Sequence, residues 1–264
     1  MATLIRELAE NPNVHQALGP GRTLHMDDAG RFAVFLNPGT SVRAATVQRV
    51  RLVATEVEPA LEEIRALLRS QGREGAEWEL GESCTPPDLV ERLLGLGLRL
   101  DDDPFAYGMV LRAPRLELPA GVEARPIASL DELRAAREVQ YAAFDDPRPV
   151  DDAEARRDFA REGIEGTTFV ALVDGEIVAA AYAGYTPPGT LLFGGATLPS
   201  ARGRGAYRAL VAARAADAVA RGAPALVTHA GRMSRPILER LGFVAVTRID
   251  RLLDELADAD YVTV

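Results

Sequence analysis

The sequence predicts a mixed α/β protein, in the α+β sense, made of two domains in tandem. Its 264 residues exceed the roughly 100–200 of a typical domain. Apolar runs bounded by turn residues alternate along the whole chain with segments of helical spacing. A long helix, a strand, a short proline-led helix and a glycine-marked return occur at 58–98 and again at 205–243. Prolines and Gly121 mark a linker, which divides the chain into domains 1–112 and 113–264.

The composition is that of a soluble globular protein. Hydrophobic residues make up 47% and charged residues 26%, enough for a sizeable core. The net charge of -9 disfavours nucleic acid as a partner, and no apolar run approaches the ~20 residues of a membrane span. Cys84 is the only cysteine, so no disulfide forms within the chain, and a structural thiol is the expected role. We expect a cytoplasmic protein without a membrane partner, as a monomer or as an oligomer such as a homodimer.

The first half contains strands, two helices and turn signals. Leu61, Ile64 and Leu68 recur at helical spacing, and Gly72 ends that helix. Alternation of apolar and polar residues indicates a strand around Val47. The expected elements are a short helix within 4–18 interrupted at 11–13, strands at 31–36 and 46–55, a helix at 58–69, a short strand at Trp78, a helix at 87–94 and broken extended structure at 98–111.

The second half contains the strongest local signals. Ser129 followed by Glu132 is a capping box, which predicts a helix start. Asp174-Gly175 between two apolar runs predicts a tight hairpin. The expected elements are strands at 122–125, 167–173, 176–185, 191–198 and 225–228, and helices at 130–144, 152–162, 205–220 and 236–241.

An Arg/Gly loop connects the strand ending at Leu198 to the alanine-rich helix. Small residues let backbone N–H groups approach an anion, and the N-terminus of the following helix adds partial positive charge. Arg202 and Arg204 would add full charges to a pyrophosphate. The alternative is a solvated turn, because glycine and arginine are common in loops. The loop is neither a P-loop nor a dinucleotide fingerprint, since no Gly-Lys-Ser/Thr and no third glycine follow.

At this loop the chain resembles the GCN5-related N-acetyltransferase (GNAT) superfamily, whose acyl-CoA loop reads Arg/Gln-x-x-Gly-x-Gly/Ala. Arg202 and Gly205 match, whereas Tyr207 replaces the final small residue. A short helix that ends in Leu-Gly-Phe at Phe243 follows, as in the family, and the resemblance covers about 121–253. It implies GNAT-like domains, each a mostly antiparallel sheet flanked by helices, and acetyl transfer from acetyl-CoA to an amine of a small molecule or peptide.

The resemblance also implies which residues hold acetyl-CoA, and it implies no metal. The pantetheine arm would lie along the strand, whose amides would polarise the thioester, and the pyrophosphate would lie on the loop. The implied residues are Ala196, Thr197, Leu198, Arg202, Gly203, Arg204, Gly205, Ala206 and Tyr207. The first half has Glu56 and Glu58 before its long helix and no glycine there. We therefore expect that half to be degenerate and to bind no acyl-CoA through this loop.

The acid and base depart from the family pattern. The family's tyrosine falls at Leu238 and its asparagine at Gly231, and 191–198 contains no acidic residue. His229 at the end of a strand is one candidate base, although a packed histidine is the simpler interpretation. Ser234 is a candidate whose simplest role is a helix cap.

Asp145 and Asp146 are further candidates for the base, and they equally suit a solvated turn before Pro147. Because no acid and no base stand at the family positions, a non-catalytic acyl-CoA-binding or regulatory protein is the alternative function. A third alternative is a structural protein without a ligand, in which the Arg/Gly turn would bind nothing.

Overall fold

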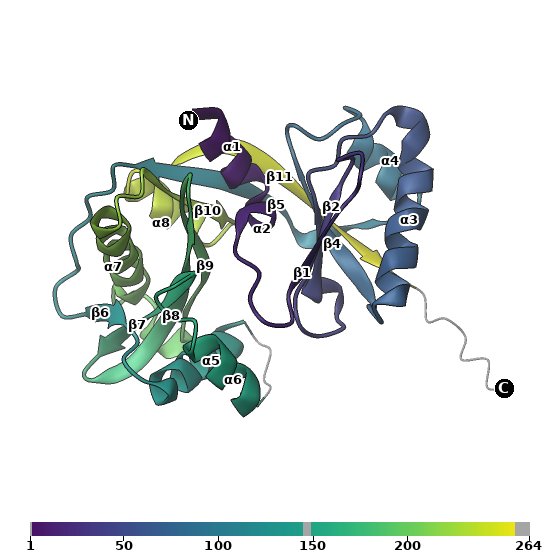
Figure 1. Ribbon diagram of the computed structural model, residues 1–264. Helices are drawn as coiled ribbons and strands as arrows, with labels where there is room; N and C mark the ends of the chain where they lie inside the picture. Colours follow the sequence, from purple (N-terminus) through teal and green to yellow (C-terminus); the bar gives the residue numbers. More distant parts are fainter. Residues whose placement is uncertain (1, 145–148, 257–264) are drawn as a thin grey trace. The chain divides into compact units, whose positions relative to one another are not determined.

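A computed structural model describes residues 2–144 and 149–256 of the chain (Figure 1). The elements up to the linker are α1 (Ala2–Glu10), α2 (Pro12–His15), β1 (Thr23–Met26), β2 (Ala33–Leu36), β3 (Ala45–Gln48), α3 (Val57–Ser70), β4 (Gly75–Gly81), α4 (Leu89–Gly95) and β5 (Arg99–Arg112). After the linker follow β6 (Glu123–Pro126), α5 (Leu130–Ala143), α6 (Asp152–Phe159), β7 (Gly166–Val173), β8 (Glu176–Thr186), β9 (Gly189–Thr197), α7 (Ala206–Ala220), β10 (Ala225–Ala230), α8 (Arg235–Arg240) and β11 (Val244–Glu255). None of the helices in these ranges is both long and apolar enough to span a membrane.

The described residues group into two compact units. Unit 1 holds the residues up to Ile5, Met109–His229 and Pro236–Val244, and unit 2 holds Arg6–Gly108, Ala230–Arg235 and the residues from 245 onward. These extents differ from the ranges 1–112 and 113–264 expected from the sequence. The last strand is the main reason: β11 pairs antiparallel with β4, from Ile249–Gly81 to Glu255–Gly75. The end of the described chain therefore completes the sheet of the N-terminal half.

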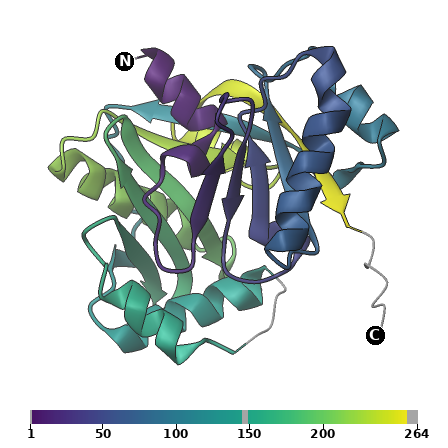
Figure 2. The ribbon, with the colours of Figure 1, turned by 45° about the vertical axis from the view of Figure 1, so that its right-hand side comes forward.

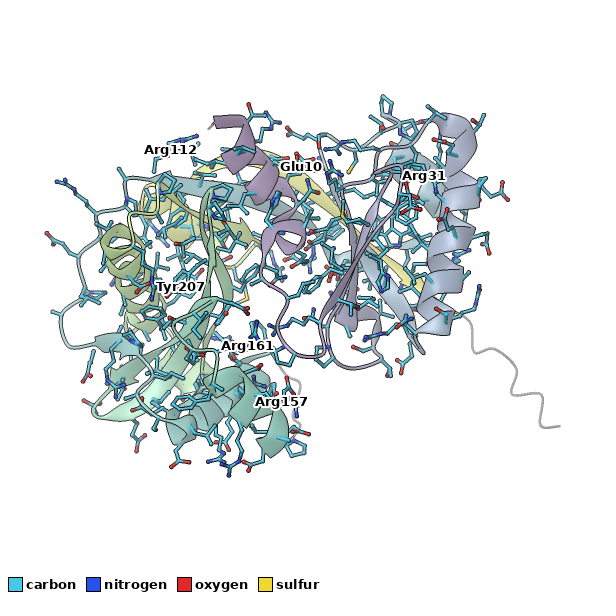
Figure 3. All side chains as sticks on the ribbon, viewed as in Figure 1. Glu10, Arg31, Arg112, Arg157, Arg161 and Tyr207 are labelled. Carbon is cyan, nitrogen blue, oxygen red and sulfur yellow. The ribbon has the colours of Figure 1, made fainter. Side chains whose placement is uncertain are left out.

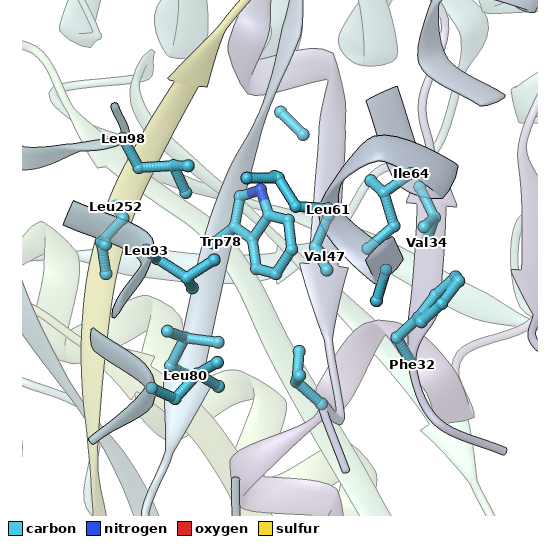
Figure 4. Packing of buried hydrophobic residues seen from close by; sticks show 14 of the residues in the cluster. Phe32, Val34, Val47, Leu61, Ile64, Trp78, Leu80, Leu93, Leu98 and Leu252 are labelled. Carbon is cyan, nitrogen blue, oxygen red and sulfur yellow. The ribbon is translucent and has the colours of Figure 1, made fainter. Parts of the chain in front are cut away.

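Unit 2 is a mostly antiparallel sheet with its core beneath α3. Its strands β1, β2, β3, β4 and β11 are neighbours in that order, and only β3 and β4, which α3 connects, run parallel. Leu61, Ile64 and Leu68 lie on one face of α3 and are fully buried. Trp78 of β4 packs in the same cluster and pairs with Leu252 of β11 (Figure 4). Apolar burial of this kind stabilises the unit by roughly 25 cal/mol per Å².

Unit 1 contains five mostly antiparallel strands, with helices on both of their faces. Its strands follow the order β10-β9-β8-β7-β6, and only β10 and β9 are parallel. Alternate residues of β8 face opposite sides. Ala181 packs in the cluster that contains Leu210 of α7, and Ala180 packs with Val139 of α5. Helices α7 and α5 therefore cover opposite faces, as can be followed in Figures 1 and 2.

The two strongest local predictions are confirmed. Asp174 and Gly175 both have positive φ angles, 55° and 85°, and they join β7 to β8 as a tight antiparallel hairpin. The Ser129 hydroxyl accepts a hydrogen bond of 3.2 Å from the N–H of Glu132 at the start of α5. The Glu132 carboxylate in turn accepts from the N–H of Ala128 at 2.7 Å. Both signals are local, so neighbouring residues suffice to determine them.

Other expectations need correction. Residues 99–111 of the stretch 98–111 belong to one continuous strand, β5, in which the charge of buried Asp101 is compensated by Arg43 at 2.8 and 2.9 Å. The strand expected at 46–55 ends at Gln48, where Arg49 takes a left-handed φ of 55°. The helix expected at 152–162 ends at Phe159. Strands β1 and β11 have no counterpart among the sequence predictions.

Candidate functional site

The loop between β9 and α7 presents unpaired backbone donors. After a 3₁₀ turn at Pro199–Ala201, Gly203 and Gly205 have φ angles of 80° and 93°, and Gly205 is the N-cap of α7. Within the described chain, the N–H groups of Gly203, Gly205 and Ala206 donate to no protein acceptor. A helix N-terminus with open amides and the positive end of the helix dipole attracts an anion. The loop predicted from sequence therefore has the geometry of an anion site.

Three arginines surround this loop. Arg202 is exposed and forms no ion pair with any residue that the structure describes. Arg204 is paired through its Nη2 with Oδ2 of Asp174 at 2.8 Å. Nη2 of Arg208 lies 3.6 Å from the position that a Cβ on Gly205 would take, so its guanidinium returns over the loop. Sequence reasoning missed Arg208; the available signal was its position three residues after Gly205, since helical side chains lean toward the N-terminus.

The ladder between the two parallel strands of unit 1 is short. The registered pairs are Leu226–Thr190 and Val227–Leu191. One residue further on, the Thr228 hydroxyl donates a hydrogen bond of 2.9 Å to the carbonyl of Leu192. Beyond this point β9 continues to Thr197 and leads into the anion loop. The site therefore combines an anion loop with the strand segment that precedes it.

The implied strand residues differ in what they offer a ligand. The N–H of Leu198 donates to the carbonyl of Val178 at 2.9 Å, so this amide is engaged in the sheet. The side-chain oxygen of Thr197 is buried and has no hydrogen-bond partner within the described ranges. An unpaired buried hydroxyl costs about 1–3 kcal/mol, which a hydrogen-bonding ligand would recover. Ala196 is 4% exposed and pairs with Ala180 of β8.

A β-bulge lies in β9 just before these residues. The register passes from Ala196–Ala180 to Phe193–Tyr182, so β9 contains one residue more than β8 across the same interval. The extra residue falls at Gly194-Gly195, and Gly194 has a φ of 56°. Tyr207, labelled in Figure 3, packs against this bulge: its Cε2 is 3.0 Å from where a Cβ on Gly195 would lie. The tyrosine of the loop motif thus supports the strand beside it.

The candidate acid and base residues lie in different units. His229 is half-buried on β10 in unit 1, directly after Thr228. Ser234 precedes α8 and belongs to unit 2. Leu238, at the position of the family's tyrosine, is completely buried and apolar. Asp145 and Asp146 lie outside the described residues.

In unit 2 the turn before α3 is closed by hydrogen bonds within the chain. Beyond β3, the Thr85 N–H donates to the Val50 carbonyl at 3.1 Å, and the Leu52 N–H donates to the Thr85 carbonyl at 3.2 Å. The Glu56 carboxylate accepts from the N–H of Val53 at 2.9 Å, at the turn that leads into α3. The turn before α3 therefore contains a carboxylate and paired backbone groups, whereas the loop before α7 contains open amides and arginine.

Metal-binding clusters are absent from the residues that the structure covers: no group of three or more His, Cys, Asp or Glu side chains could hold a metal ion.

The chain is similar to one family model and to several solved structures. Residues 130–243 match the model of the acetyltransferase (GNAT) family. A GCN5-related N-acetyltransferase from Kribbella flavida superposes with a TM-score of 0.67 at 23% identity, over 98% of this chain and 97% of that one. A tandem GNAT protein from the clavulanic acid biosynthesis pathway gives 0.60 at 19%, over 97% and 89%. A GCN5-related N-acetyltransferase from Sphaerobacter thermophilus gives 0.61 at 15%, over 96% and 85%.

These structures are similar to this chain in fold along nearly its whole length. No curated protein sequence matches the chain.

Proposed function

We propose that the chain is an N-acetyltransferase that moves the acetyl group of acetyl-CoA to an amine of a small molecule or peptide. The supporting observation is the loop before α7, where the exposed Arg202 stands beside the unpaired amides of Gly203 and Gly205. This loop lies inside the range that matches the GNAT family model. Backbone donors at a helix N-terminus, together with an arginine, suit the pyrophosphate of coenzyme A.

The residues present fit the rest of the cofactor. Arg202, Gly203, Arg204, Gly205, Ala206 and Tyr207 would hold the pyrophosphate, and Ala196, Thr197 and Leu198 would line the pantetheine arm. That arm carries two amides, one of which the unpaired Thr197 hydroxyl would bind. Because the Leu198 amide already donates to Val178, an amide nearer the bulge is the better candidate for the thioester carbonyl.

The reaction transfers an acyl group between two nucleophiles. The amine nitrogen attacks the thioester carbonyl carbon, the C–S bond breaks, and its electron pair leaves on sulfur as the coenzyme A thiolate. The amine proton passes to a base, for which His229 is the candidate, because an imidazole accepts protons near neutral pH. Ser234 is the candidate donor to the thiolate, and its alternative role is the cap of α8. Orientation and a polarised carbonyl would supply most of the acceleration.

Unit 2 would have a structural role and would not bind acetyl-CoA. The backbone of Thr85 and the carboxylate of Glu56 fill the counterpart of the anion site, which supports one acetyl-CoA site per chain and a degenerate N-terminal half in a tandem arrangement. The matching order of strand, helix, parallel strand and short helix in β3-α3-β4-α4 and β9-α7-β10-α8 also supports this arrangement.

Calorimetric titration with acetyl-CoA tests the binding part of the proposal. We expect one saturable site per chain, lost in Arg202→Ala/Arg204→Ala and kept in Arg157→Ala. Arg157 is an exposed arginine of α6, far along the chain from the loop and labelled in Figure 3. Two sites would contradict the degenerate N-terminal half. No binding by the unmodified protein would overturn the acetyl-CoA assignment.

Product analysis over a panel of amines separates catalysis from binding alone. We expect an N-acetylated product by mass spectrometry, strongly reduced in His229→Gln. The second candidate function, a non-catalytic acyl-CoA-binding or regulatory protein, is favoured by buried Leu238 and by the lack of an acidic residue in 191–198. It predicts saturable binding without any product across the panel.

A further inference from the structure

A buried arginine lies behind the β9 bulge. Arg214 of α7 is 1% exposed and forms no ion pair with a carboxylate among the residues described. Its Nε donates to the Leu210 carbonyl at 3.0 Å, and its Nη1 donates to the Tyr182 carbonyl at 3.2 Å. Burial lowers the pKa of Arg214 to about 10, so it keeps its proton at neutral pH. A buried cation without a counter-ion is costly, so its position needs an explanation.

Arg214 is aimed at the irregular part of the sheet. Tyr182, whose carbonyl it holds, is the β8 residue at which the register with β9 resumes after the bulge. Nη2 lies 3.8 Å from the position of a Cβ on Gly195, and Tyr207 of the same helix packs there as well. The positive charge therefore stands directly against the bulge backbone.

The opposite face of the bulge is held by α5. Nε2 of Gln140 donates a hydrogen bond of 2.8 Å to the Gly194 carbonyl. A Cβ on Gly194 would come within 2.7 Å of the same Nε2, so only glycine allows this approach. Since α5 and α7 cover opposite faces of the sheet, Gln140 and Arg214 hold the bulge from its two sides.

We propose that Gln140 and Arg214 are positioning residues for acetyl transfer, which fix the β9 bulge and place a buried positive charge behind the thioester carbonyl. This inference rests on the proposed acetyl-CoA site. Negative charge develops on the carbonyl oxygen as the amine attacks and then on sulfur as the C–S bond breaks. A fixed cation in a water-poor interior favours both charges, and it requires no reorganisation during the reaction.

The thioester carbonyl itself reports this effect. In difference infrared spectra of acetyl-CoA labelled with ¹³C at the carbonyl, the bound carbonyl stretch should lie at lower frequency than in free acetyl-CoA. Arg214→Met, which replaces the guanidinium with an apolar side chain, should return the band toward its free position. Gln140→Met should broaden or partly return it, and Arg214→Lys, which keeps the charge, should retain most of the shift.

Kinetics give a second readout. We expect Arg214→Met to lower kcat about tenfold or more, with the Kd of acetyl-CoA changed less than about threefold, because the loop that binds pyrophosphate is untouched. If Arg214→Met fails to fold by circular dichroism, Gln140→Met decides. A wild-type carbonyl frequency in folded Arg214→Met, or in Gln140→Met where Arg214→Met does not fold, would overturn the inference while acetyl-CoA binding stands. Absence of binding by the wild type would instead overturn the proposed function on which the inference rests.

Discussion

The guanidinium of Arg204 lies 2.8 Å from the carboxylate of Asp174, which ties the anion loop to the turn of the β7–β8 hairpin. Both side chains are largely exposed, so the pair contributes little to folding stability. Its importance is electrostatic: the pair partly cancels the charge of one loop arginine and leaves Arg202 as the fully available one. The two arginines of the motif are therefore not equivalent.

We predict that Arg202→Ala weakens acetyl-CoA binding more than Arg204→Ala does. Loss of one charge-assisted hydrogen bond to a phosphate costs roughly 1.5–3 kcal/mol, or about ten- to a hundredfold in Kd. Asp174 compensates part of the charge of Arg204, so removing the Arg204 side chain should weaken acetyl-CoA binding less. Calorimetric titration of the two single variants, with Arg157→Ala as the control, measures the two losses in acetyl-CoA affinity. Equal losses would show that the Asp174 pair does not persist in the bound state.

Asp174→Asn should strengthen acetyl-CoA binding about two- to threefold at low salt, and the gain should vanish near 1 M salt, where charges are screened beyond ~3 Å. Asparagine tolerates the left-handed φ of 55° at this position, so the hairpin should persist. Titrations at two ionic strengths measure the effect. A gain that is independent of salt would point to a change in loop structure rather than to released charge.

Gly205→Ala should impair both stability and binding. At a φ of 93° an alanine costs about 1–2 kcal/mol, and its Cβ would lie 3.3 Å from Pro119. Gly222→Ala is the matched control, since Gly222 has a φ of 72° at the other end of the same helix and open space around it. Both variants should melt at lower temperature, and only Gly205→Ala should lose acetyl-CoA affinity. Parallel loss in both variants would mean that general destabilisation explains the effect.

The last strand is tied to α3 by a buried ion pair. Arg65 holds the carboxylate of Asp254, which is 1% exposed, at 2.8 Å. We predict that Arg65→Met lowers the free energy of unfolding by about 3 kcal/mol, because the carboxylate remains buried without a partner. Glu62→Gln, which removes the exposed partner of the same arginine, should cost less than about 1 kcal/mol. Urea unfolding of both variants gives the comparison, and similar losses would contradict it.

Cys84 should behave as an inert structural thiol. Burial raises its pKa from 9.0 to about 11, so almost no thiolate is present near neutral pH. The native state should therefore resist alkylation by iodoacetamide until it unfolds. Because the raised pKa belongs to the folded state, this contribution to stability is present below pH 9 and is lost as the pH rises toward 11. Cys84→Ala should keep acetyl-CoA binding and abolish any alkylation that the native protein shows.

The sequence predicted those features that neighbouring residues determine. The Asp174-Gly175 hairpin, the Ser129 cap and the Arg/Gly loop each depend on a few adjacent side chains. Pairing between distant segments could not be predicted in this way, and β11 is the clearest case, because its partner β4 lies about two thirds of the chain away. Among candidate functional residues, Gln140 and Arg214 carry no motif; their position becomes meaningful only once the β9 bulge between them is known.

The segment around Thr85 also limits what substitutions before α3 could achieve. Its backbone hydrogen bonds with Val50 and Leu52 belong to the core arrangement of unit 2, and the Glu56 carboxylate closes the adjacent turn independently. Introducing glycines and arginine before α3 would therefore not create a second anion site, because the intervening backbone would still occupy the space. Removing that backbone alone would leave the acidic turn in place. We therefore expect that an anion site before α3 would require both changes together.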